Sequence, residues 1–354
     1  MPIFDQGYQH WSGHLSGHAW RWLAISRRGL QTVLKGKLVR LTLLVCWLPA
    51  IVLAFVLCMW GLIERQSEMI IAFKPYLTTL LGRDIVADPR AYRADIWTIC
   101  YHYFFAWQLW FAMVLVLLAG PNLISQDLRY NALPLYFSRP LRRIDYFLGK
   151  LGIIVGLIGL AMIGPAVLTY ILGLLFSLDI TIIRDTYSIL LASLAYGVIL
   201  SVSAGLLVLA FSATTRNSRY VALLWLAMLL ISSTVSFVLV RIDQAHRLHA
   251  SNKGFRAWRD ESFVSDELKA EEADWRSLVS YTANLSRVQE QLLRTNKSWR
   301  RLADLSPTGT RSPILQKMLY TQHPWYWSAG VLVSLAAFSA CTLNLTVKSL
   351  DRLK

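Results

Sequence analysis

Six long apolar stretches constrain this chain more than any other feature of its sequence. Each has more than 20 residues and none contains Asp, Glu, Lys or Arg; they cover 41–63, 97–119, 151–177, 187–213, 220–240 and 325–347. A helix of about 20 apolar residues is long enough to cross the hydrocarbon core of a bilayer. The pattern therefore predicts an all-α integral membrane protein with six transmembrane helices.

The composition excludes the main alternatives. Of the 354 residues 55% are hydrophobic and only 16% are charged, whereas a soluble domain has about 25% charged residues. Disordered chains are poor in apolar residues, so disorder is excluded as well. The four cysteines lie in apolar stretches without the spacing of a zinc site. The net charge is +15, and the basic residues lie in the segments between the apolar stretches. This distribution indicates how the chain is oriented in a membrane rather than a nucleic-acid partner.

The basic residues are distributed unevenly between the two sides. The segment 1–40 has a net charge of +5 and 120–150 has +3, whereas 64–96 is neutral and 178–186 has −1. Short cytoplasmic loops are the ones enriched in Lys and Arg. We therefore expect cytoplasmic termini in a multi-pass protein of the cell membrane, such as a bacterial inner membrane.

This orientation defines four expected regions. They are a cytoplasmic tail over 1–40, five transmembrane helices over 41–240, an extracytoplasmic helical loop over 241–324, and the sixth helix with its tail over 325–354. Within the tail, 19–38 has Arg and Lys on one helical side and apolar residues on the other. Such a segment predicts a helix in the membrane interface. The alternative is a continuation of the first transmembrane helix.

The expected loop contains a heptad pattern. Apolar residues at 3-4 spacing predict one amphipathic helix over about 275–303. The heptad face comprises Leu278, Tyr281, Leu285, Val288, Leu292, Trp299 and Leu302. We expect this face to pack on a neighbouring helix or on a second copy, and an extracytoplasmic partner is the alternative.

The sequence lacks the residues that most membrane catalysts need. Ion-coupled carriers and intramembrane enzymes place ionisable groups at membrane depth, and the six apolar stretches have no Asp, Glu, Lys or Arg. The chain has no GxxxxGK[ST] motif for binding nucleotide phosphates. His10, His14 and His18 recur every four residues, but glycines interrupt them and no further ligand completes a metal site. We therefore expect no catalytic residues, no metal, no cofactor and no enzymatic activity.

The segment 121–150 mixes charges with regularly placed apolar residues between the second and third apolar stretches. Pro134 and Pro140 break it into short pieces, because proline interrupts a helix. Its Leu, Tyr and Phe content is too high for a solvated loop. These features predict short amphipathic helices that dock a partner.

The same segment resembles the second cytoplasmic segment of type-2 ATP-binding-cassette (ABC) permeases. The resemblance rests on Ile124-Ser125, Asp127, Arg129, Ala132 to Leu135, Ser138 to Leu141, Arg143, and Asp145 to Lys150. The family pattern is Ile-Ser-x-acid, a Leu-rich stretch, a Ser/Thr-x-Pro turn, an Arg and a Gly-Lys. Here Asn131-Ala132 replaces the usual Gly-Thr, the acid is Asp rather than Glu, and the last loop is unusually long.

The resemblance implies a permease subunit that forms a homodimer or a heterodimer and recruits two separate ATPase subunits. The segment 121–150 would be the coupling element that enters the ATPase groove. The ATPase-docking residues expected on this basis are Asp127, Arg129, Leu133, Leu135, Tyr136, Phe137, Arg139 and Arg143.

Two functional hypotheses follow. The first is ATP-driven export or flipping of a hydrophobic or amphipathic substrate, which suits uncharged spans that carry Tyr, Ser and Gln108. The alternative is a non-transporting envelope machine, in which ATP hydrolysis moves the 241–324 region to act on an extracytoplasmic partner. The long heptad pattern favours this alternative more than a typical family member would.

Overall fold

The structure is a computed structural model that describes residues 20–65, 78, 83–132, 136, 141–177, 181–252, 275–303 and 323–351. All regular elements in these residues are helices. Six helical segments are long and apolar enough to cross a membrane: Lys37–Glu64, Pro89–Arg129, Arg143–Ser177, Thr181–Thr214, Ser218–Ile242 and Trp325–Thr346. The predicted helical class and number of spans are confirmed, and the chain has the helices of a multi-pass membrane protein.

Three of the spans are built from consecutive helices. The first joins α2 (Lys37–Cys46) and α3 (Leu48–Glu64), the second joins η2 (Pro89–Tyr92), α7 (Arg93–Ala119) and α8 (Asn122–Arg129), and the third joins α10 (Arg143–Ile158), the π-helix η3 (Gly159–Ile163) and α11 (Gly164–Ser177). The other three spans lie within α12 (Thr181–Thr214), α13 (Ser218–Asn252) and α18 (Trp325–Asp351). Pro165 explains the π-helix, because proline cannot donate the backbone hydrogen bond that an α-helix needs there.

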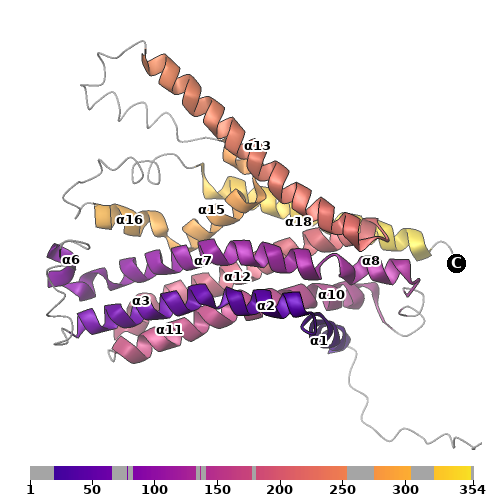
Figure 1. The fold of residues 1–354 in the computed structure, drawn as a ribbon, viewed down its shortest axis with the longest axis horizontal. Helices are drawn as coiled ribbons and strands as arrows, with labels where there is room; N and C mark the ends of the chain where they lie inside the picture. The colour runs from indigo at the N-terminus through magenta and orange to yellow at the C-terminus, as the bar shows by residue number, and fades with distance from the viewer. Residues whose placement is uncertain are drawn as a thin grey trace, which may run out of the picture.

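The bundle is elongated and its two ends differ (Figure 1). We call one end the α8 end, where α1 (Arg21–Val33) and α8 lie and where α18 finishes. The opposite end is the α6 end, where α6 (Arg83–Ala87) and α16 (Thr295–Ala303) lie. Helix α13 diverges from the bundle towards the α6 end.

Helices α7 and α12 form the centre of the bundle. In the most apolar part of α12, 61% of the residues are buried, and in that of the second span 56% are buried. The corresponding share is 17% for α13 and for α18. Tyr196 on α12 packs edge to face on Phe105 of α7, with ring centroids 5.4 Å apart. The outer helices expose Leu, Ile, Val and Phe side chains, as expected for surfaces that contact lipid tails.

Helix α1 packs on a face of small residues along α10. The Ser26 hydroxyl donates a hydrogen bond to the Gly149 carbonyl at 2.9 Å. A Cβ atom added to Gly149 would lie 2.7 Å from the Cβ of Ile25, closer than side chains tolerate. After Val33 the chain turns at Gly36, which has extended backbone angles, and enters α2. A separate helix therefore precedes the first span, and its placement in a membrane interface stays a prediction.

The predicted single helix over 275–303 is wrong in its continuity. The structure has a 3₁₀ helix η5 (Trp275–Val279), then α15 (Tyr281–Leu293), then α16. Arg294 ends α15 in a left-handed conformation with φ of 57°. A heptad pattern predicts which side of a segment is buried, but it does not detect such a break.

Helix α15 packs beside the spans rather than outside them. The Tyr281 and Ser203 hydroxyls are 2.9 Å apart, and Ser203 lies about 33 Å along α12 from Thr181 and about 16 Å from Thr214 at 1.5 Å per residue. The Tyr281 ring also lies 6.4 Å from that of Trp225 on α13. Helix α15 therefore lies alongside the transmembrane helices, and the extracytoplasmic location of 241–324 stays a prediction.

The heptad face is covered by the chain itself. Tyr281, Leu285 and Val288 are buried, and the other four members are half-buried: Leu278, Leu292, Trp299 and Leu302. The Trp299 ring packs on Tyr103 of α7 with centroids 6.4 Å apart. Within the described residues this face therefore packs on the transmembrane helices.

Candidate functional site

Helix α8 lies within the predicted docking segment 121–150, and its buried side is anchored to α12. The Ser212 hydroxyl accepts hydrogen bonds from the backbone N–H groups of Ile124 at 3.0 Å and Ser125 at 2.9 Å. The same hydroxyl donates to the Pro121 carbonyl at 3.1 Å. The first N–H groups of a helix have no partner within the helix, so Ser212 supplies one from another span. A displacement of α8 would therefore be transmitted to α12 through Ser212.

A second connection joins α8 to α10. The Asp127 carboxylate lies 2.7 Å from the Lys150 ammonium and accepts a hydrogen bond of 2.6 Å from the Tyr146 hydroxyl. The side chains of Asp127 and Lys150 are only 15% and 10% exposed. The Tyr146 ring is fully buried and the Lys150 ammonium lies 5.5 Å from its centre. We call Asp127, Tyr146 and Lys150 the α8–α10 joint.

Tyr136 covers the joint from outside the spans. Its ring lies 5.4 Å from that of Tyr146. Burial raises the pKa of Tyr136, and the nearby Asp127 carboxylate raises it further. The phenol therefore stays neutral at physiological pH.

The predicted docking residues fall into three groups. Asp127 and Tyr136 lie inward, at the joint. Arg129 is exposed with its guanidinium 5.8 Å from the Tyr130 ring, and Arg143 is half-buried in the first turn of α10. Leu133, Leu135, Phe137 and Arg139 lie outside the described residues. Docking by these side chains stays a prediction.

The α8 end also exposes apolar side chains that sequence reasoning did not single out. Tyr130 is 73% exposed and Ile144 is 67% exposed. They lie just after α8 and in the first turn of α10, on either side of 131–142. A partner that covers 121–150 would bury them.

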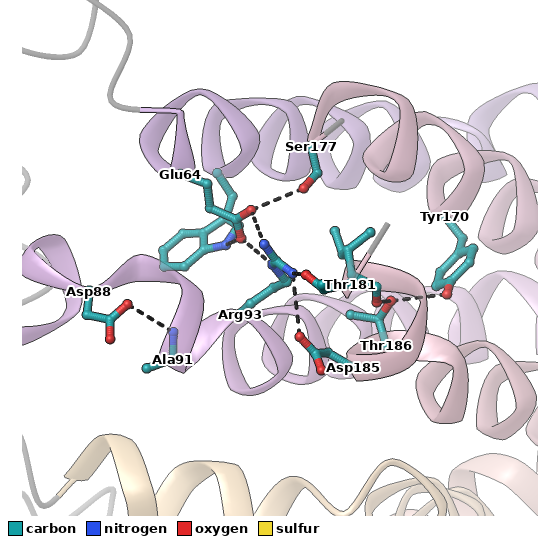
Figure 2. A network of polar contacts seen from close by, with 11 residues as sticks. Glu64, Asp88, Ala91, Arg93, Tyr170, Ser177, Thr181, Asp185 and Thr186 are labelled. Carbon is teal, nitrogen blue, oxygen red and sulfur yellow. Dashed lines mark hydrogen bonds and ion pairs between the residues drawn. The ribbon is translucent and has the colours of Figure 1, made fainter. Parts of the chain in front are cut away.

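Sequence reasoning also missed a buried charged network at the α6 end (Figure 2). The Arg93 guanidinium donates to both oxygens of Glu64, with Nε–Oε1 2.7 Å and Nη2–Oε2 2.8 Å. The side chains of Arg93 and Glu64 are 1% and 3% exposed. Trp60 and Ser177 donate to the same carboxylate at 2.8 and 3.1 Å. Thus one ion pair joins α7 to α3, and a hydrogen bond from Ser177 to the same carboxylate adds α11.

The network continues to α12 and stops at the surface. Arg93 Nη1 lies 3.3 Å from the Thr181 hydroxyl and 3.5 Å from Asp185, whose side chain is 44% exposed. Glu64 and Arg93 lie just outside the apolar stretches 41–63 and 97–119, so a search for charge within those stretches does not find them. Glu64, Arg93, Thr181 and Asp185 each have a partner in this network, which indicates a structural clamp.

Gln108 connects the second span to the first. It is fully buried, and its amide donates to the Cys46 carbonyl at 2.6 Å. This bond braces α7 against α2. Among the described residues no cluster of His, Cys, Asp and Glu could hold a metal ion.

Comparisons with protein-family models, with curated proteins and with solved structures found no match to this chain. The functional argument therefore depends on the geometry of the molecule and on the residues of 121–150.

Proposed function

We propose that this chain is the membrane-spanning permease subunit of an ABC transporter. In this proposal it forms a homodimer or heterodimer with a second permease subunit, and two separate ATPase subunits supply the energy. The substrate would be hydrophobic or amphipathic, in keeping with helices that are uncharged over their apolar windows. The ATPase activity would reside entirely in the partner.

The observation that carries the proposal is the connection of α8 to two further spans. A force on 121–150 would pass to α10 through Asp127 and Lys150, and to α12 through Ser212. An ion pair with both groups largely buried resists separation, because an unpaired charge would be left out of water. This arrangement suits a segment that transmits motion from a docked ATPase.

The alternative function is an envelope machine in which ATP hydrolysis moves the 241–324 region to act on an extracytoplasmic partner. The long heptad pattern favoured it, but in the described residues the pattern is divided between α15 and α16, which pack on α12 and α7. The observation that favoured the alternative therefore no longer does so.

The proposal requires the α8 end to face the cytoplasm. Arg216 follows the end of α12, whose Ser212 bonds to α8, whereas Lys297 lies on α16 at the opposite end of the bundle (Figure 1). Both side chains are exposed. In a variant whose four cysteines are replaced by alanine, Lys297→Cys should react with a membrane-impermeant thiol reagent in intact cells. Arg216→Cys should react only after permeabilisation. The reverse pattern would contradict the orientation and with it the proposal.

Loss of the docking surface should release the ATPase. The first check is whether a neighbouring reading frame encodes an ATPase with Walker motifs. After co-expression, Tyr130→Asp combined with Ile144→Asp should abolish co-purification of that ATPase, because a partner would have to bury two new charges. Both side chains are more than two-thirds exposed, so membrane insertion and monodispersity should be unchanged.

Two further variants make the docking test specific. Arg142→Ala should have little effect, because an exposed ion pair is worth about 0–1 kcal/mol. Leu135→Asp with Phe137→Asp tests the part of the segment outside the described residues and should also release the ATPase. Retention of the ATPase at full stoichiometry by both double variants would show that 121–150 is not the docking site.

A further inference from the structure

A cleft of about 730 Å³ lies between α1, the start of α2 and the α8 end of the spans. Its lining is mixed. Ile25, Val33, Val39, Leu118 and Ile153 supply apolar surface, whereas Arg28, Thr32, Asn122 and Gln126 supply polar groups. A pocket of this size is typical of small-molecule sites, and its mixed lining suits an amphiphile.

A second hollow of about 490 Å³ shares Arg28 and Thr32 with the cleft. Lys35 and Arg40 line it, and both are exposed. Neither these two residues nor Arg28 forms an ion pair with a carboxylate among the described residues. The two hollows therefore meet at a mouth with three positive charges, which we call the basic mouth.

The charge of the basic mouth is not neutralised from the cleft side. Among the described residues, Asp127 is the only carboxylate that lines the cleft, and it is paired with Lys150 at 2.7 Å. An anion that entered the mouth would therefore meet Arg28, Lys35 and Arg40 without a competing carboxylate from the described part of the chain. Arginine binds phosphate through two parallel hydrogen bonds, and lysine binds it as a point charge.

The location of the mouth identifies the source of the anion. Helix α1 precedes the first span and departs from the line of α2 at the α8 end (Figure 1). Trp20 at the N-cap of α1, Leu23 on α1 and Leu38 on α2 are exposed, so exposed apolar side chains lie on the same part of the chain as the three cations. Exposed tryptophan and leucine beside cations are typical of the level of lipid headgroups.

We propose that the cleft binds a phospholipid with an anionic headgroup. The phosphate lies at the basic mouth, between Arg28, Lys35 and Arg40, and an acyl chain follows the apolar lining towards Ile153. Basic clusters on amphipathic helices attract anionic lipids. The inference depends on the membrane location of the chain and not on an ATPase partner.

The test measures binding to the purified full-length chain in detergent. Dioleoylphosphatidylglycerol should raise the melting temperature, whereas dioleoylphosphatidylcholine and inorganic phosphate at the same concentration should not. Arg28→Gln, Lys35→Gln and Arg40→Gln together should weaken phosphatidylglycerol binding by about 100-fold, at about five-fold for each basic residue. These side chains are exposed, so the fold should be retained.

Two control variants separate a built site from general attraction. Arg216→Gln with Arg219→Gln removes exposed cations at the same end and should leave binding unchanged. Thr32→Trp fills the junction of the two hollows without changing charge and should abolish binding. Equal stabilisation by both lipids, equal stabilisation by inorganic phosphate, or equal loss in the Arg216 and Arg219 variant would each overturn the proposal.

Discussion

Replacing Arg93 by methionine should lower the free energy of unfolding by about 3–5 kcal/mol. The substitution leaves the Glu64 carboxylate without its guanidinium in a place where its side chain is 3% exposed. Trp60 and Ser177 would still donate to it, but two neutral donors do not replace a cation. Reversible unfolding of the purified chain in mixed micelles measures the change.

A double variant tests whether the lost stability comes from the unpaired charge on Glu64. Arg93→Met combined with Glu64→Leu should recover most of the lost stability, because apolar residues of similar volume often replace a buried ion pair at little cost. Arg301→Met is the matched control at the same end. Arg301 lies 3.1 Å from Asp95, whose side chain is 10% exposed, but the Arg301 side chain itself is 54% exposed. Solvent therefore reaches this pair, and loss of Arg301 should cost clearly less than loss of Arg93. Equal effects of Arg93→Met and Arg301→Met would contradict the clamp.

The six spans were predictable because hydrophobicity over about 20 residues is a strong signal. Their lengths were not. The second span runs from Pro89 to Arg129, well beyond the apolar stretch 97–119. Charged residues terminate an apolar stretch on a hydropathy scale, but they do not terminate a helix whose charges are paired.

The two charged networks could not be predicted for the same reason. Glu64 and Arg93 are 29 positions apart, and Asp127 and Lys150 lie in separate helices. Each residue alone looks like a loop charge or a marker of orientation. Only the packing of α3 on α7, or of α8 on α10, brings the partners within 3 Å.

The heptad face shows a different limit of prediction from the sequence. Its spacing correctly predicted that one side of 275–303 is buried, which is a local property. The partner of that side is a tertiary property, and the spans already had apolar surface to offer. The break at Arg294 carries no sequence signal, because glycine or asparagine is usual in the left-handed conformation.

Asp127→Asn is the second substitution for which we expect a large effect, here on coupling. The change keeps an acceptor for the Tyr146 hydroxyl but removes the charge that pairs with Lys150. A hydrogen bond to a charged group is worth about 1.5–3 kcal/mol. The conformation in which α8 and α10 are connected through the α8–α10 joint should therefore be populated at least about ten-fold less. The rate at which the reconstituted ATPase complex moves a fluorescent phosphatidylglycerol across the vesicle bilayer should fall by a similar factor.

Binding of the ATPase should persist in Asp127→Asn, because Asp127 lies inward and the exposed Tyr130 and Ile144 are unchanged. Lys150→Arg, which keeps the ion pair, should retain transport. Asp145→Asn removes a carboxylate that caps α10 with a hydrogen bond of 3.3 Å, and it should have a small effect. Loss of lipid movement together with retention of the ATPase is expected only if the α8–α10 joint transmits force from the docked ATPase. Full lipid movement by Asp127→Asn would exclude that role, and loss of the ATPase would assign Asp127 to docking.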